Sequence, residues 1–201
     1  MPHNPSPINA WSTAQQFNSN EFLTSTQYSQ LVNNVSLMYA RPYITVTNTT
    51  AQTLATNAAI FTGGSPTTIT NSPSTSAGSI TFSASTLTVP LTGLYRLTMN
   101  ISVGANATAG LYTMVATLAG GATANNHVFY TNRQPTSTTS TTFSNGSFLI
   151  PMQQGGGTYP NTVSFTFLAN ASQTVQGQAL PLGVNSTFVQ LEYLGASNGS
   201  I

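Results

Sequence analysis

The chain of 201 residues contains no cysteine, no lysine and no aspartate, and only two histidines. Its charged side chains are Glu21, Arg41, Arg96, Arg133 and Glu192. They make up 2% of the residues, whereas ordinary globular domains carry about 25%. Several classes of function are therefore excluded by inventory, before any motif is considered.

Enzymatic sites have few residues from which they could be built. Paired-carboxylate catalysis would have to bring together Glu21 and Glu192 from opposite ends of the chain. A serine triad could use only His127 as its base, without an aspartate or a Gly-x-Ser-x-Gly elbow, so we interpret His127 as a loop or strand-edge histidine. A closed zinc site lacks ligands, and a phosphate-binding loop lacks its lysine. We predict no enzyme, no catalytic residue, no metal site and no cofactor.

The same scarcity limits the partners. Three arginines spread along the chain form no basic patch, so we predict no direct contact with nucleic acid. No segment approaches about 18 consecutive apolar residues, which predicts no membrane span. The first seven residues, Met-Pro-His-Asn-Pro-Ser-Pro, have neither the basic nor the apolar region of a signal peptide. The absence of cysteine says little about the compartment, because a domain of this size needs no disulfide.

Neutral polar residues take the place of charges: Thr, Ser, Asn and Gln dominate, while the hydrophobic content is an ordinary 39%. Surface charge normally resists self-association, and neutral hydrogen-bonding groups are buried against a second copy at little ionic desolvation cost. This composition predicts a subunit packed among copies of itself. The alternative is a low-charge secreted protein.

Asn-x-Ser/Thr triplets are frequent in such a chain and arise by chance. They occur at Asn34, Asn48, Asn100, Asn106, Asn145, Asn170, Asn185 and Asn198. Chance is the favoured explanation, but glycosylation stays open for those in predicted loops.

From Pro42 onward the pattern is that of β-strands. The clearest run is 95–103, in which Tyr95, Leu97 and Met99 alternate with Arg96 and Thr98, as in a half-buried antiparallel strand. Further strands are predicted around 43–47, 80–82, 87–89, 112–118, 128–130, 148–150, 163–167 and 189–193. Glycine and proline breakers separate them, and 65–78 and 135–142 are predicted to be long surface loops. We predict an all-β fold: a single antiparallel eight-stranded jelly roll, a two-sheet sandwich, over residues 42–201.

Residues 1–41 differ in texture and are predicted to form an N-terminal arm. Their large apolar side chains fit neither a period of 2 nor one of 3.6, and we find no heptad. Within the arm we predict a short helix from Asn20 to about Val32. A free arm would not normally carry the single tryptophan of the chain. We expect the arm to lie against its own barrel or a neighbour's through interface residues Trp11, Phe17, Phe22 and Tyr39.

Arg96 lies on the strand face opposite the predicted core. In a chain so poor in charge it would either hydrogen-bond backbone carbonyls or meet Glu192, and simple exposure to solvent is an equal alternative.

The segment 80–103 resembles the central strand pair of the C1q/TNF-like jelly rolls. Val89-Pro90, Gly93 and Tyr95 match the step in which one strand ends, turns through Gly-x-Tyr and continues as a long core strand. Proline ends a strand because it cannot donate to the ladder, and glycine permits the turn. The segment 188–194 is similar to the closing strand of that fold. The resemblance implies a jelly roll over about 43–195, and heads of this type usually form trimers.

In size and texture the whole chain also resembles the single-jelly-roll vertex (penton) or minor capsid proteins of large icosahedral double-stranded DNA viruses, such as the chlorovirus group. That resemblance implies a virion protein, assembled in the host cytoplasm, that forms a homo-oligomer and contacts neighbouring capsid proteins. The favoured expectation is therefore a pentameric capsid subunit. The alternative is a trimeric receptor- or glycan-binding head of a fibre or spike, with the polar loops as its binding surface.

Overall fold

The computed structural model describes residues 24–39, 41–62, 66–71, 79–104, 111–122, 127–133, 142–169, 171–177 and 187–195. These residues form one helix, α1 (Ser25–Tyr39), followed by thirteen strands. The strands are β1 (Tyr43–Asn48), β2 (Gln52–Leu54), β3 (Ala58–Ala59), β4 (Pro66–Asn71), β5 (Thr81–Ser83), β6 (Thr86–Thr88), β7 (Gly93–Val103), β8 (Leu111–Ala119), β9 (His127–Arg133), β10 (Thr142–Met152), β11 (Thr162–Ala169), β12 (Gln173–Val175) and β13 (Phe188–Gly195).

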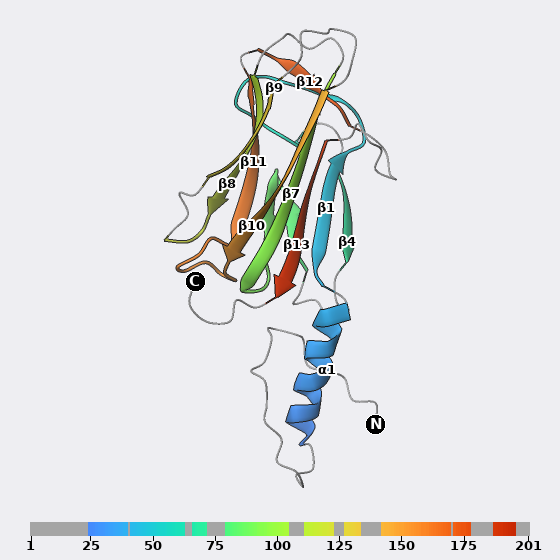
Figure 1. Ribbon diagram of the computed structural model, residues 1–201, viewed down its shortest axis with the longest axis vertical. Coiled ribbons are helices and arrows are strands. Elements are labelled where there is room, and N and C mark those ends of the chain that lie inside the picture. Colours follow the sequence, from blue (N-terminus) through green and yellow to red (C-terminus); the bar gives the residue numbers. More distant parts are fainter. Residues whose placement is uncertain are drawn as a thin grey trace.

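The strands form two antiparallel sheets that pack face to face as a sandwich (Figure 1). Sheet A has the order β2-β12-β7-β13-β1-β4, and β10 also pairs with β7. Sheet B has the order β5-β6-β11-β8-β9, and β3 also pairs with β11. The chain passes repeatedly between the sheets: β7 is in sheet A, β8 and β9 in sheet B, β10 in sheet A, β11 in sheet B and β13 in sheet A. The predicted all-β, two-sheet jelly roll is confirmed.

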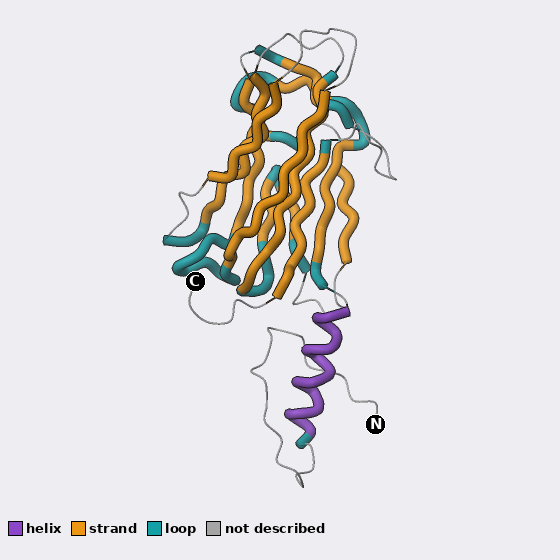
Figure 2. The backbone as a smooth tube through the Cα atoms, viewed as in Figure 1, coloured by secondary structure: helices purple, strands orange, loops and turns teal. Residues whose placement is uncertain are grey.

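The core lies between the two sheets, whose strands Figure 2 shows as a backbone tube. Alternating residues of each long strand are buried in this core. On β7 the side chains of Tyr95, Leu97 and Met99 are fully buried, as the alternation predicted. Tyr112 and Phe167 stack in sheet B with their ring centres 6.2 Å apart. Burying a large apolar side chain contributes about 1.5–3 kcal/mol, so these inward rows stabilise the fold.

One predicted loop is partly wrong. Residues 66–71, expected to be loop, form β4 and pair with β1 from Asn48↔Pro66 to Tyr43↔Asn71. Threonine is β-branched and favours strands, so a segment rich in threonine is compatible with either state, and proline is tolerated as the first residue of a strand. Thr142 of the second predicted loop begins β10, and the remainder of both predicted loops lies outside the described residues.

The helix of the N-terminal region starts and ends later than predicted, at Ser25 and Tyr39 instead of Asn20 and Val32. Its start is a capping box: the Gln27 amide N–H donates to Thr24 Oγ1 at 3.3 Å, and the Thr24 amide donates to Gln27 Oε1 at 2.8 Å. Its end precedes Pro42, which disfavours a helical conformation at the residue before it. No helix in the described part of the chain is long and apolar enough to cross a membrane.

Helix α1 extends beyond the end of the sandwich at which β1 begins, and it lies against neither sheet in Figure 1. One end of the molecule therefore carries two surfaces, which are helix α1 and the half of sheet A next to it.

Candidate functional site

The outward face of sheet A is built from rows of side chains, because paired residues on adjacent strands point to the same side of a sheet. One row runs from Leu149 on β10 through Arg96 on β7 and Glu192 on β13 to Tyr43 on β1. Each of these residues alternates with a buried neighbour, such as Ile150. This row crosses the four main strands of the sheet.

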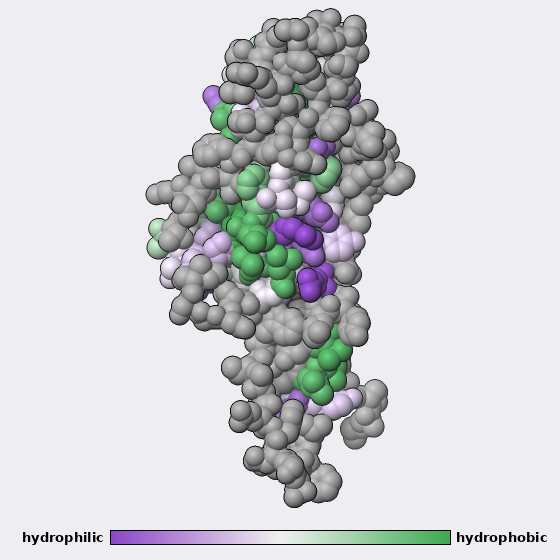
Figure 3. Space-filling view, viewed as in Figure 1, coloured by the Kyte–Doolittle hydropathy of each residue, from purple (hydrophilic) through white to green (hydrophobic). Residues whose placement is uncertain are grey.

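Apolar residues lie at the α1 end of this face. Leu149 is 64% exposed, although the residues on either side of it in β10 are half-buried or buried. The next row toward α1 pairs Pro151 with Leu94, both half-buried. We call Leu94, Leu149 and Pro151 the apolar patch. In Figure 3 an apolar area is visible on this side of the sandwich, directly beside hydrophilic side chains.

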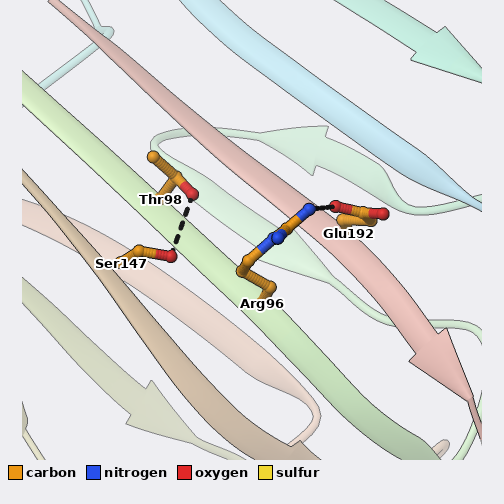
Figure 4. A network of polar contacts seen from close by, with 4 residues as sticks. All are labelled: Arg96, Thr98, Ser147 and Glu192. Atoms are coloured by element: carbon orange, nitrogen blue, oxygen red, sulfur yellow. Dashed lines mark hydrogen bonds and ion pairs between the residues drawn. The ribbon is translucent and has the colours of Figure 1, made fainter.

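An ion pair adjoins the apolar patch. Arg96 Nη2 donates to Glu192 Oε2, and the two side chains are 50% and 21% exposed (Figure 4). In the next row Thr98 Oγ1 and Ser147 Oγ lie 3.4 Å apart. Of the arrangements expected for Arg96, the meeting with Glu192 is therefore the one found. An ion pair this exposed contributes about 0–1 kcal/mol to folding, so stability alone does not account for it.

The chemistry of this face suits association. Its described groups include aliphatic side chains, hydroxyls and one carboxylate paired with a guanidinium. Within the described residues no three His, Cys, Asp or Glu side chains come together as metal ligands. Among the described strands β10 is hydrogen-bonded to β7 alone, so its other edge forms no ladder there. An exposed apolar patch beside such an edge is typical of a surface that binds another protein.

The predicted motif residues lie in and next to the turn that connects β6 of sheet B with β7 of sheet A. Val89 ends its strand by donating its amide to the Asn161 carbonyl at 3.0 Å. The Tyr95 hydroxyl donates to the Leu91 carbonyl at 2.8 Å, which closes the turn that Pro90 begins. Gly93 has a reason beyond the turn: a Cβ there would lie 2.3 Å from the Gly195 carbonyl oxygen, so glycine permits the close approach of β13.

The predicted interface role of the arm residues is not tested by the described part of the chain. Trp11, Phe17 and Phe22 lie outside the described residues, and Tyr39 is described only as the last residue of α1. Their interface role stays a prediction.

Exposed apolar residues in two places of the described structure were not predicted from the sequence. Leu149 was placed within a strand but not on a surface; its signal is an apolar residue at an outward position, between two inward ones. The second set lies on α1, where Tyr28, Leu31 and Val35 are 56%, 47% and 41% exposed. Their spacing of three and then four residues matches positions a, d and a of a heptad. Three positions do not make a heptad repeat, so the expectation of no heptad in residues 1–41 stays a prediction.

Among the side chains that the structure describes, the sequon asparagines Asn48 and Asn100 are buried in the sandwich. Asn48 is fully buried and its Nδ2 donates to Gln52 Oε1 at 3.0 Å, while Asn100 is 6% exposed. A glycan has no room at either position, which supports chance as the origin of these two triplets.

Comparison with known proteins gives a fold and no family. No protein-family model and no curated protein matches the chain. Among solved structures, murine APRIL matches with a TM-score of 0.52 and 12% identity, over 77% of this chain and 99% of that one. The Eiger TNF from S. frugiperda matches with a TM-score of 0.54 and 10% identity, over 81% and 98%. The fold is a TNF-like jelly roll. At 12% and 10% identity, the likeness of this chain to APRIL and Eiger shows the fold alone.

Proposed function

We propose that this protein is a non-enzymatic structural subunit whose TNF-like jelly roll closes into a ring of identical copies through the outward face of sheet A. The observation that carries the proposal is Leu149, a large aliphatic side chain that is 64% exposed on an otherwise orderly sheet. A closed homo-oligomer buries the same patch on every copy, which removes it from water without leaving an unpaired copy.

The paucity of charge supports the same proposal. With five charged side chains in 201 residues, two copies meet with little repulsion and few desolvated ions. The single ion pair of the face then defines the register of the contact, because burying either partner alone is costly. Three copies are the expected number, since C1q/TNF-like heads form trimers.

A pentameric capsid subunit is the second candidate, and composition is the observation that favours it. A surface of neutral hydroxyls and amides suits a molecule surrounded by neighbours on all sides. This candidate includes location in the virion and contacts with other capsid proteins. As a free head on a fibre or spike, the trimer would instead use its polar loops to bind a receptor or glycan.

The test is the mass of the purified protein in solution, measured for the wild type and for two glutamate variants. We expect a closed oligomer for the wild type, with three copies supporting the head and five the capsid vertex. Leu149→Glu places a second carboxylate opposite Arg96, which Glu192 already pairs, so the contact would have to bury one negative charge in excess. Burying an uncompensated charge costs about 3–5 kcal/mol, so we expect monomers.

Thr81→Glu is the matched control, because Thr81 is exposed on β5 of sheet B and gains the same charge. It should keep the wild-type mass. A wild-type monomer at micromolar concentration contradicts the proposal. Dissociation of Thr81→Glu but not of Leu149→Glu would also contradict it, because the contact would then lie on sheet B.

A further inference from the structure

Helix α1 carries a stripe of exposed apolar side chains that the sandwich does not use. Tyr28, Leu31 and Val35 are exposed, and neighbouring Val32 is half-buried. In heptad terms Tyr28 and Val35 take position a and Leu31 takes position d. The three therefore lie on one side of the helix as a seam, and the sequence continues the same spacing at Met38. We call Tyr28, Leu31 and Val35 the seam.

We propose that the seams of the associated copies pack on one another, so that the α1 helices form a short parallel bundle at the end of the ring of heads. The proposal rests on the proposed function, because the copies must first be brought together through sheet A. The partner of the seam is α1 of a second copy of this chain, in the same orientation.

Three observations favour a second copy over another partner. The first is spacing: a seam that alternates three and four residues is the pattern by which helices pack in register on copies of themselves. The second is charge. Helix α1 has no acidic residue in its first turn and no basic residue in its last, and its sequence STQYSQLVNNVSLMY has no charged side chain at all. Parallel copies therefore bring no like charges together.

The third observation is place. The helix leads into β1 of sheet A through residues 40–42, so copies joined through sheet A start their helices close to a common axis. Figure 3 shows apolar side chains at α1 open to the same side of the molecule as the apolar area of sheet A. The seam and the apolar area of sheet A can therefore both face one symmetry axis.

The association of the helices would depend on the heads. Two heptads are too short to hold a bundle together alone, since isolated helices below about 12–15 residues are marginal in water. Tethering by the heads makes the contact between helices effectively intramolecular, so a weak seam suffices. The bundle would in turn fix all arms on one side of the ring and leave the opposite ends of the sandwiches free.

The absence of cysteine from the chain allows a clean test. In a parallel bundle, position 31 of one copy faces position 31 of another. We expect Leu31→Cys in the full-length protein to form covalent dimers on oxidation, or with a short bismaleimide where the sulfurs are too far apart for a disulfide. Thr26→Cys is the matched control: Thr26 is exposed at position f, away from the seam, and should remain uncrosslinked under the same conditions.

Native mass of the same samples separates the two proposals. A closed oligomer whose Leu31→Cys thiols do not crosslink overturns the bundle and leaves the assembly of the heads standing. A monomer overturns both. Val35→Cys, at position a, is the second variant in case Leu31→Cys does not assemble, and crosslinking at Thr26 as efficient as at the seam would also overturn the bundle.

Discussion

The two sheets of the sandwich present outward faces of different chemistry. On sheet B the outward rows are mostly threonine and serine, as in Thr88–Thr162 and Thr86–Ser164. Their hydroxyls turn back to the sheet: Thr162 donates to the Ala119 carbonyl at 3.1 Å and Ser164 to the Thr117 carbonyl at 3.4 Å. These two outward hydroxyls of sheet B are thus satisfied within the same chain.

Sheet A instead carries the exposed Leu149 and the ion pair of Arg96 with Glu192. An aliphatic group gains from being covered, and a half-exposed ion pair contributes little while it faces water. Both sheets are regular, but their outward faces differ. Hydroxyls of sheet B bond to carbonyls of the same chain, whereas contact with a partner would stabilise the outward face of sheet A.

The largest effect is expected where the register of sheet A is fixed. Gly93→Ala brings a Cβ within 2.3 Å of the Gly195 carbonyl oxygen and 2.6 Å of Tyr193 Cε2, so β13 must move relative to β7. We expect the free energy of unfolding to fall by about 2–3 kcal/mol, as for other overpacked sites, with weaker assembly. Denaturant unfolding and native mass measure the two effects.

Gly155→Ala is the control for this change. Gly155 has a φ of +72° but nothing within 4 Å of an added Cβ, so only the backbone strain of about 1 kcal/mol should appear. Equal losses at positions 93 and 155 would show that the close approach of β13 does not limit stability.

The next effect concerns the ion pair. Glu192→Gln leaves Arg96 without its carboxylate, and if the contact covers this row the guanidinium is buried unpaired. We expect the dissociation constant of the oligomer to rise about tenfold or more, which is about 1.4 kcal/mol. In the Leu149→Glu background, where the chain should be monomeric, the same change should alter stability by less than about 1 kcal/mol.

The double variant Arg96→Gln/Glu192→Gln sharpens the comparison, because it removes both charges and restores a neutral pair. It should assemble more tightly than either single variant. If both single variants assemble like the wild type, the ion pair lies outside the contact and the row is a solvent-facing one like those of sheet B.

The fold was largely predictable because the sequence signal for strands is strong where one face is buried. The alternation from Tyr95 to Val103 placed every inward residue of β7 correctly, and Tyr112, Phe165 and Leu191 were likewise assigned to buried rows. Strand β4 was missed because its threonines are common to loops and strands. Only pairing with β1, a contact distant in the sequence, decides between the two.

The candidate site was less predictable, for a physical reason. Exposure is a property of the whole fold: Leu149 looks like any core residue until the register places it opposite Arg96 on the outward face. The helix boundary, in contrast, was available in the sequence, because Thr24 and Gln27 form a Thr-x-x-Gln capping box. This capping box predicts a helix start at Ser25, and the helix then carries Tyr28, Leu31 and Val35 at a-d-a spacing.

The smallest expected effect compares a buried tyrosine in each sheet. In sheet A the Tyr95 hydroxyl donates to the Leu91 carbonyl, whereas in sheet B the Tyr112 hydroxyl is buried without a hydrogen-bond partner in the described part of the chain. Tyr95→Phe should therefore cost about 1 kcal/mol of stability at neutral pH. Tyr112→Phe removes a buried polar group that is not satisfied there, so it should be neutral or slightly stabilising.

Alkaline pH provides a second readout on the same pair. Burial raises the pKa of both Tyr95 and Tyr112 above the ordinary value for tyrosine. A raised folded-state pKa gives stability that is complete below the unfolded pKa of about 10 and is lost as the pH rises above it. Each Phe variant should flatten this alkaline decline, which thermal unfolding between neutral pH and about pH 11 measures. If Tyr112→Phe costs as much as Tyr95→Phe at neutral pH, then the Tyr112 hydroxyl has a partner, and the two sheets do not differ in this respect.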